Sequence, residues 1–516
     1  MEDLTKEIKK ITDQYPDFAK GWIQKRLHQE VDSTGQLPDK DTIRNIRDCL
    51  ASLDEKSKTI QKLYKISFTG MNTIQEKWHK ELAKKAEKLK EFGGKPFEYE
   101  PILKCDNGFQ WVRLNTPEAK DYEGNAMGHC VGSGGYDDND TIIFSLRDKD
   151  NIPHITVEYN EENNYFNQIQ GKSNTRPNEK YYDDIFKLYK ITGANNYNEL
   201  ARNEAYAVLN DKILIGDDAI LACQQDTVFD SVKLTEDSEI TEWNYNVSGD
   251  FDAYGSRLEH VNPDCKFGGK TNIKKTNIKE WHNDVPGSFY AGFSKLEYIN
   301  PECKFGGKVD ISDTKNIKEW HCDVGGDFDA YDSKLEYVHP DCKFGGYVDI
   351  SSTPIKEWYH DVPGVFTVSG SKLEYVSPDC VFGNVVNISN TNIKEWHHDV
   401  PDDFIAYYSN LECVNPKCKF GGKVDIRDTR NLKEWHNDVP GNFKASGSKL
   451  EFVNPDCVFG NGINISDTNI KEWHNDVPGY FDASNSKLEY VAPKCKFDNG
   501  VNISNTNIKE WHHDVP

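Results

Sequence analysis

The C-terminal half of this chain repeats itself, and the repeat limits the possible folds more than any other feature. The string TNIKEWH begins at Thr276, Thr391, Thr468 and Thr506, and looser versions lie between these positions. The tryptophans of the repeat recur every 38 or 39 residues. Self-similarity at this period predicts stacked units that each contact only their neighbours.

Each unit divides into two similar halves, such as VDISDTKNIKEW and FDAYDSKLEYV. Both halves contain an aliphatic residue that stands three positions before a large apolar residue. These aliphatic residues form a ladder from Ile240 to Ile508, with steps of 18 and then 20 or 21 residues. The ladder predicts about fifteen coils of 18 to 21 residues within residues 229–516.

This pattern resembles the leucine-rich repeat, L-x-L-x-x-N-x-L, at the short end of that family's length range. We therefore expect a β-solenoid with short parallel strands on one face and turns or extended segments on the other. Coils stacked about 4.8 Å apart would form a rod or shallow arc about 70 Å long. In VDIS the Val and Ile should point inward and the Asp outward. At the corners VPG, NPDC and FGG, proline fixes φ and glycine permits positive φ.

The repeated Trp-His-x-Asp string could hold a metal ion or form a turn. Asn244 and Tyr359 replace the His in two coils, and a set of metal ligands does not tolerate such changes. We predict a turn after a core tryptophan, in which the His caps the backbone of a neighbouring coil.

Seven of the thirteen cysteines follow the same period, from Cys265 to Cys495. Successive cysteines are two coils apart, about 9.5 Å by strand spacing, whereas a disulfide needs Cα atoms within about 7 Å. We predict buried free thiols, which suits a reducing compartment such as the cytoplasm.

One side chain per coil should point outward from the strand, and these side chains are acidic, amide-rich and varied. A varied polar row is typical of a protein-binding surface, although a merely solvated face is the alternative. The candidate partner-binding residues are Asp252, Tyr290, Asp310, Asp329, Asp349, Ile405, Asp425 and Asp482; the remaining outward residues are Asn272, Thr367, Asn387, Lys444, Asn464 and Asn502.

The N-terminal part does not contain the repeat. The pattern of apolar residues predicts a helical segment over residues 1–92. Its helix at residues 74–92 is rich in lysine, which indicates either a solvated face or a contact for nucleic acid or an acidic partner. Residues 95–210 predict an α+β domain, with a short helix near His129 and Cys130 and then an antiparallel meander of about three strands. Residues 211–228 would connect this domain to the solenoid.

Within the α+β domain, GHCVGSGG, IIFSLRD, PHITVEY and QIQGKSN follow one another in order. These strings resemble the PcfJ-like domain of conjugative plasmids and phages, over about residues 100–180. The resemblance implies a mobile element as the setting and does not include the solenoid.

A catalytic site in this domain would use Cys130 as nucleophile, His154 as base and Gln168 as orienting group. A metal-dependent nuclease using Glu158 and Lys172 is a second possibility, with too few ligands for Mg²⁺. Zinc at His129 and Cys130 lacks a second ligand pair. A structural network is the main alternative: Arg147 would pair with Glu158 across the sheet. The network could also form a pocket for a nucleotide or peptide group, and its other members are Thr156, Gln170 and Asn174.

The sequence thus favours an interaction or scaffold protein of a phage or mobile element, which binds a partner protein along the polar solenoid face. A thiol-dependent hydrolase or transferase and a nucleic-acid-associated factor are the alternatives. The net charge of −23 opposes non-specific binding to nucleic acid. We expect a cytoplasmic protein with no membrane span, cofactor or metal. Its oligomeric state stays open, and the last coil either covers itself or forms an interface.

Overall fold

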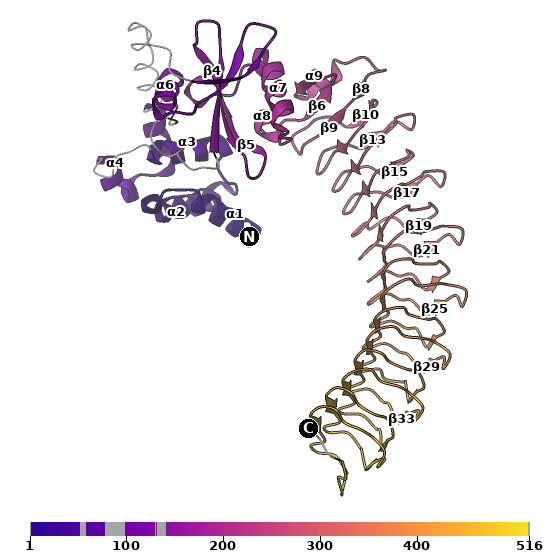
Figure 1. Ribbon diagram of the computed structural model, residues 1–516. Coiled ribbons are helices and arrows are strands. Elements are labelled where there is room, and N and C mark those ends of the chain that lie inside the picture. Colours follow the sequence, from indigo (N-terminus) through magenta and orange to yellow (C-terminus); the bar gives the residue numbers. More distant parts are fainter. Residues whose placement is uncertain (1, 52–57, 78–98, 130, 132–140, 514–516) are drawn as a thin grey trace. The chain divides into compact units, whose positions relative to one another are not determined.

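The computed structural model describes residues 2–51, 58–77, 99–129, 131 and 141–513. The chain forms two compact units (Figure 1): Met1–Asn203 with Asp211–Ile213, and Glu204–Asn210 with Leu214–Pro516. None of the helices in the described residues is long and apolar enough to cross a membrane.

The first unit begins with helices that pack around Trp22. This side chain is 1% exposed, and its Nε1 donates to the carbonyl of Ile66 at 2.9 Å. The helices are α1 (Glu2–Asp13), α2 (Asp17–Thr34), α3 (Lys40–Ala51) and α4 (Lys58–Gln61), and residues 68–77 are also helical.

An antiparallel sheet of five strands follows, in the order β1-β2-β3-β4-β5. The predicted meander is therefore present, with β1 and β2 added at one edge. Trp111 of β2 is fully buried and donates through Nε1 to the carbonyl of Asp184 at 2.8 Å. The strands are β1 (Glu100–Lys104), β2 (Gln110–Arg113), β3 (Thr141–Arg147), β4 (Pro153–Asn160) and β5 (Tyr165–Gln170); α7 (Tyr182–Thr192) and α8 (Asn198–Ala201) follow them.

Helix α6 (Pro117–Met127) lies between β2 and β3 in the sequence. It is the helix that we predicted near His129 and Cys130, and it ends two residues before His129. Local sequence sets both ends. The Thr116 side chain accepts from the Ala119 N–H, Pro117 occupies the first turn, and Gly128 is left-handed at the C-cap.

The second unit includes β6 (Tyr206–Leu209) and α9 (Asp217–Leu221), while β7 (Lys212–Ile215) has its first two residues in the first unit and its last two in the second. β6 is antiparallel to β9 (Ser231–Lys233), and β9 is parallel to the first coil strand, β12. This antiparallel pair covers the N-terminal edge of the solenoid, where an unpaired strand would otherwise be exposed.

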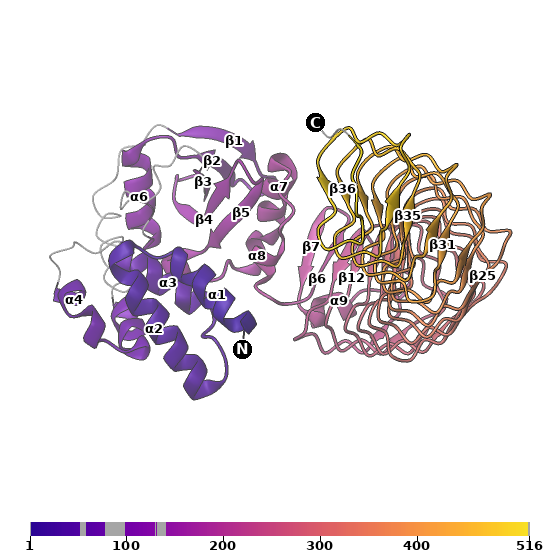
Figure 2. The same ribbon diagram turned by 90° about the horizontal axis from the view of Figure 1, so that it is seen from below.

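From β12 onward, each coil adds one strand of two residues to a single parallel sheet. This long sheet lies on the inner side of the curved solenoid (Figures 1 and 2). Its strands are β12 (Phe251–Asp252), β14 (Thr271–Asn272), β16 (Phe289–Tyr290), β18 (Val309–Asp310), β20 (Phe328–Asp329), β22 (Val348–Asp349), β24 (Phe366–Thr367), β26 (Val386–Asn387), β28 (Phe404–Ile405), β30 (Val424–Asp425), β32 (Phe443–Lys444), β34 (Ile463–Asn464), β36 (Phe481–Asp482) and β38 (Val501–Asn502).

Elsewhere in the coil, tryptophan strands pair in parallel with strands of the following coil. The pairs are β10 (Glu242–Trp243) with β13 (His260–Val261), β15 (Glu280–Trp281) with β17 (Tyr298–Ile299), β19 (Glu319–Trp320) with β21 (Tyr337–Val338), β23 (Glu357–Trp358) with β25 (Tyr375–Val376), β27 (Glu395–Trp396) with β29 (Cys413–Val414), β31 (Glu434–Trp435) with β33 (Phe452–Val453), and β35 (Glu472–Trp473) with β37 (Tyr490–Val491). A further parallel pair joins β8 (Val228–Phe229) to β11 (Asn246–Val247).

The predicted solenoid of about fifteen coils is confirmed. Its tryptophans from Trp243 to Trp473 are at most 1% exposed, and Trp281 packs against Phe289 with ring centroids 5.0 Å apart. Each buried tryptophan removes roughly 150–250 Å² from water, worth about 4–6 kcal/mol at roughly 25 cal/mol per Å². The predicted buried thiol column is also confirmed, because all seven cysteines of the column are free and buried.

The glycines of the VPG and FGG corners do not have the predicted positive φ. In the solenoid, positive φ occurs at another turn, the one that contains Gly255, Gly370 and Gly447. The first glycine of FGG instead allows close packing between coils. At Gly421, a Cβ atom would overlap the carbonyl oxygen of Pro401 in the preceding coil.

Candidate functional site

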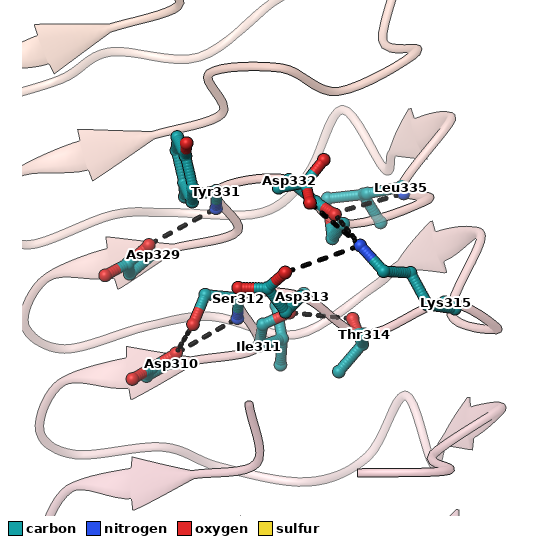
Figure 3. Close-up of polar contacts among 11 residues, drawn as sticks. Asp310, Ile311, Ser312, Asp313, Thr314, Lys315, Asp329, Tyr331, Asp332 and Leu335 are labelled. Carbon is teal, nitrogen blue, oxygen red and sulfur yellow. Dashed lines mark hydrogen bonds and ion pairs between the residues drawn. The ribbon is translucent and has the colours of Figure 1, made fainter. Parts of the chain in front are cut away.

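The outward residues of the long sheet form one row, which we call the outward row, because every strand pairs in the same register. Asp310 lies beside Asp329, and Asp329 beside Asp349, on consecutive strands. Figure 3 shows the side chains of Asp310 and Asp329 pointing the same way. The full row comprises the fourteen residues predicted above, from Asp252 to Asn502.

Charge within the outward row is unevenly compensated. Burial raises the pKa of Asp329, and the carboxylates of Asp310 and Asp349 raise it further. Burial also acts on Asp310, but hydrogen bonds from Lys274 and Ser312 outweigh it and lower the pKa of Asp310. The Lys274 Nζ lies 2.6 Å from that carboxylate.

Two of the predicted partner-binding aspartates are covered. Asp310 is 5% exposed and Asp425 is 3% exposed. Arg427 binds Asp425 through two hydrogen bonds of 2.8 Å. The more accessible row members include Tyr290 and Ile405, which are half-buried.

A second regular position lies three residues after each outward residue. Its backbone is left-handed in every coil from Gly255 to Asn505. Figure 3 shows two of these residues, Asp313 and Asp332, with Lys315 between them at 3.4 Å and 2.9 Å. The fourteen residues at this position are Gly255, Lys275, Phe293, Asp313, Asp332, Ser352, Gly370, Asn390, Tyr408, Asp428, Gly447, Asp467, Asn485 and Asn505.

Glycine, asparagine and aspartate tolerate left-handed backbone, whereas bulky side chains are strained there. Lys275, Ser352, Phe293 and Tyr408 depart from this rule. The two aromatic side chains, Phe293 and Tyr408, are 55% and 53% exposed. Tyr408 also contacts Tyr407, with ring centroids 5.7 Å apart. Two strained aromatic side chains therefore stand in solvent beside the outward row.

The Trp-His-x-Asp string is structural, but the predicted role of its His was wrong. The residue after the His caps the backbone: Asn283 donates through Nδ2 to the carbonyls of Asn262, Pro263 and Cys265 at 2.9 to 3.1 Å. The final aspartate accepts from the next coil, as Asp284 does from the Lys304 N–H at 2.8 Å.

The His itself lies on the surface. His282 Nε2 is 3.2 Å from the Glu280 carboxylate, and its ring contacts Tyr298 of the next coil. Glutamate and tyrosine alternate along this side of the solenoid, and we call the following residues the side row: Glu280, Tyr298, Glu319, Tyr337, Glu357 and Tyr375. In other pairs along this side the glutamate is kept, but the tyrosine position is occupied by His260, Cys413 or Phe452.

In the first unit, the predicted pairing of Arg147 with Glu158 was wrong. In the antiparallel register, Arg147 lies opposite Pro153, whereas Glu158 lies opposite Ile143. Arg147 instead binds Glu123 of α6 at 2.6 Å, with both side chains buried. Glu158 accepts from Asn167 Nδ2 at 2.8 Å.

The buried Glu123 is the centre of a polar network. Ser145 donates to it at 2.9 Å and Thr156 at 2.6 Å. Burial raises the pKa of Glu123, while Arg147 and the two hydroxyls oppose that rise. Because its hydrogen-bonding groups are satisfied internally, this network serves to hold α6 against the sheet.

His154 forms a different relay from the predicted triad. Its Nε2 lies 3.0 Å from Asp148 Oδ2, and its Nδ1 lies 2.8 Å from the Tyr181 hydroxyl. Burial raises the pKa of Asp148, but hydrogen bonds from His154 and two backbone N–H groups outweigh it and lower this pKa. We therefore assign the imidazole proton to Nε2, so Tyr181 donates to Nδ1.

The other predicted site residues are dispersed. Cys130 lies outside the described residues. Gln168 is buried in β5 opposite Glu158. The remaining contacts are those of His129 Nε2 with the Gly171 carbonyl at 2.6 Å, Gln170 with Arg202 at 3.0 Å, and Asn174 with Asn45 at 3.3 Å, while Lys172 is exposed.

A cavity of about 1150 Å³ lies beside the His154 relay. Its lining includes His154, Tyr181, Lys172, Arg176 and Lys180. Among the described residues, no group of three or more His, Cys, Asp or Glu side chains is arranged to hold a metal ion.

Sequence reasoning missed Glu123, Asp148 and Tyr181. Glu123 looks like an ordinary surface residue of a helix, and its contacts span 22 to 33 residues. Asp148 lies six residues from His154, a spacing that is compatible with a hairpin and could have indicated the pair. Tyr181 lies 27 residues away, and no local pattern marks it.

Comparison with known families confirms the predicted resemblance. A family model described as PcfJ-like protein matches residues 22–186. The match includes the predicted region of residues 100–180 and extends to the helices before it. No curated protein matches the sequence.

Two solved structures resemble part of the chain. YopM from Yersinia enterocolitica WA-314 is 15% identical over 55% of this chain and 63% of its own, with a TM-score of 0.34. YopM from Yersinia pestis, described as a leucine-rich effector protein, is 14% identical over 55% of this chain and 79% of its own, with a TM-score of 0.30. The chain thus spans less than two thirds of the first structure. Since both TM-scores are below 0.5, the leucine-rich-repeat-like solenoid is described from its own coils.

Proposed function

We propose that this chain is an interaction or scaffold protein whose solenoid binds a partner protein along the outward row. The PcfJ-like match supports a phage or mobile element as its setting, and the host cytoplasm as its location. We retain as part of the proposal the division into a helical segment (1–92), an α+β domain (95–210), a connector (211–228) and the solenoid.

One observation carries the proposal: the outward row varies in charge and polarity, whereas the buried positions of the coil repeat. The tryptophans and the aliphatic ladder follow the same pattern from coil to coil, as stacking requires. The outward row instead changes from Tyr290 to Asp310, and from Thr367 to Ile405 and Lys444. A surface whose side chains differ at regular spacing can present a specific pattern to a partner, which a solvated face does not need.

The exposed aromatic residues at the left-handed position supply anchors for such a partner. Left-handed backbone at a bulky residue destabilises the fold by about 1–2 kcal/mol, and such strain is typical of functional sites. Aromatic side chains also dominate binding energy at interfaces. Phe293 and Tyr408 are therefore the residues at which we expect the strongest contacts, and Ile405 extends the apolar area near Tyr408.

The test uses the full chain with a photo-crosslinking amino acid at Thr367, and in a matched chain at Tyr375 of the side row. We expect a specific partner to be captured from position 367 and not from position 375. With that partner purified, Tyr408→Asn should weaken binding at least about tenfold. Tyr375→Asn is the control, because it removes another exposed tyrosine, one that belongs to the side row. Capture through position 375 alone, or equal affinities of both variants, would contradict the proposal.

Two alternatives from the sequence have separate tests. A thiol-dependent enzyme centred on Cys130 predicts fast alkylation of this thiol at neutral pH. A nucleic-acid-associated factor that uses residues 74–92 predicts retention on DNA that falls steeply with salt. Slow alkylation of Cys130 argues against the first alternative, and a lack of retention on DNA at low salt argues against the second.

A further inference from the structure

We propose that the cavity beside the His154 relay is a binding site for a nucleoside phosphate, either free or at a single-stranded end. The site lies in the first unit and is independent of the partner surface proposed for the solenoid. Its volume of about 1150 Å³ exceeds what one phosphate group needs, so the ligand must carry a larger group.

Cationic side chains define the chemistry of the cavity. Lys172 and Lys180 line it and are exposed, and no described residue forms an ion pair with either of them. Arg176 lies in the same wall and is half-buried. The carboxylates of Asp150 and Glu179 also line the cavity. In a chain of net charge −23, two exposed lysines in one wall, without an ion pair to any described residue, favour an anionic ligand at this place.

The relay gives this wall a fixed polar group. The Tyr181 hydroxyl donates to His154 Nδ1, so its oxygen keeps lone pairs that can accept a hydrogen bond from a ligand. Asp148 fixes the imidazole from the other side. Phe109 packs edge-on against both rings, with centroids 5.1 Å from His154 and 5.6 Å from Tyr181. A hydroxyl held in this way can contact a sugar or base donor without reorganisation.

The rest of the lining distinguishes a nucleoside from a phosphorylated side chain. Half-buried Tyr122 lines the cavity together with Pro153 and Pro177; Tyr182 also lines it, but it is buried, with the Arg176 guanidinium 6.0 Å from its ring centroid. Aromatic side chains stack on nucleobases irrespective of their identity, whereas a phosphoserine peptide presents no planar ring to them. The combination of lysines, aromatic rings and a hydroxyl acceptor fits a nucleoside phosphate.

Calorimetric titration of the full chain tests the site with five probes: AMP, dTMP, an eight-nucleotide oligo(dT), inorganic phosphate and a phosphoserine peptide. We expect a nucleotide or the oligonucleotide to bind, with an affinity that falls as salt rises. Binding of AMP or dTMP alone identifies a free nucleotide, and tighter binding of the oligonucleotide identifies a strand end. The double variant Lys172→Ala, Lys180→Ala should weaken binding at least about tenfold.

Lys104→Ala is the matched control, because Lys104 is an exposed lysine of the same unit outside the cavity. Its affinity should equal that of the unmodified chain. Tyr181→Phe keeps the ring and removes the hydroxyl, and should weaken binding severalfold, with its thermal transition recorded to verify folding. No binding of any nucleotide, binding of the phosphoserine peptide alone, or unchanged affinity in the double lysine variant would overturn the proposal.

Discussion

The corner caps show how one position can serve the same purpose with different residues. The residue two positions after the tryptophan is Asn283, Cys322 or His360 in three different coils, and each contacts a backbone carbonyl of the preceding coil. Only histidine among these residues changes charge near neutral pH. Coils capped by histidine therefore respond to acid, while those capped by asparagine do not.

Acid should destabilise the solenoid through His360 and His398. Burial lowers the pKa of both imidazoles below the ordinary value of 6.5, although their hydrogen bonds to carbonyls oppose this shift. Below about pH 6.5 the unfolded chain binds more protons than the folded chain, so stability falls as pH falls. The variant His360→Asn, His398→Asn should lose less stability between pH 7 and pH 5 than the unmodified chain, as measured by urea midpoints. His282 provides the control: it lies on the surface, is not a corner cap, and belongs to a different coil, so His282→Asn should change the pH dependence less than the double variant does.

Relief of backbone strain should stabilise the protein at Phe293. This residue has a φ of 59° and an exposed side chain. Because asparagine occupies the same position at residues 390, 485 and 505, Phe293→Asn should raise the free energy of unfolding by about 1 kcal/mol. Denaturation in urea measures the change, and Tyr375→Asn, at an exposed strand position, should give no gain. A loss of stability in Phe293→Asn would show that the ring contributes to the fold.

At the scale of elements, the sequence predicted periodic features and missed contacts between distant segments. The aliphatic ladder fixed the number of coils, and strand alternation fixed which residue of VDIS points outward. The sequence predicted that the His caps the neighbouring backbone, whereas the next residue does so; His282 and Asn283 are adjacent and both can form hydrogen bonds, so the pattern does not distinguish them. The network of Glu123 and the relay of His154 depend on pairing register and on helix placement, which no local pattern encodes.

Close packing between coils favours glycine at the first position of the FGG corner. Gly421→Ala would place a Cβ against the Pro401 carbonyl oxygen, and the coils would have to separate. We expect a loss of about 1–3 kcal/mol, as for other overpacked sites, measured by urea denaturation. Gly370→Asn is the matched control: Gly370 is left-handed, and asparagine occupies the equivalent position at residue 390. Equal stability of the two variants would contradict a packing role for Gly421.

At the scale of the whole molecule, the two units differ in how they are held together. The first unit has a sheet and helices whose contacts connect distant parts of the chain. In the solenoid each strand of the long sheet pairs with the strands of the neighbouring coils, so a defect in one coil acts first on its neighbours. The loss of local stability caused by a substitution in one coil should therefore decrease with distance along the solenoid and be absent from the first unit.

Trp396→Ala tests this expectation. Trp396 is fully buried and packs against Phe382 and Phe404, with ring centroids 5.5 Å and 5.2 Å away. Removing a buried aromatic side chain destabilises by about 3–5 kcal/mol, and hydrogen exchange reports local opening separately for each segment. Amide protection should fall most in the coils next to Trp396, less toward β12 and β36, and not at all in β3–β5. An equal loss of protection in both units would mean that the chain unfolds as one cooperative body, and the separate tests of the cavity and of the outward row would then no longer be independent.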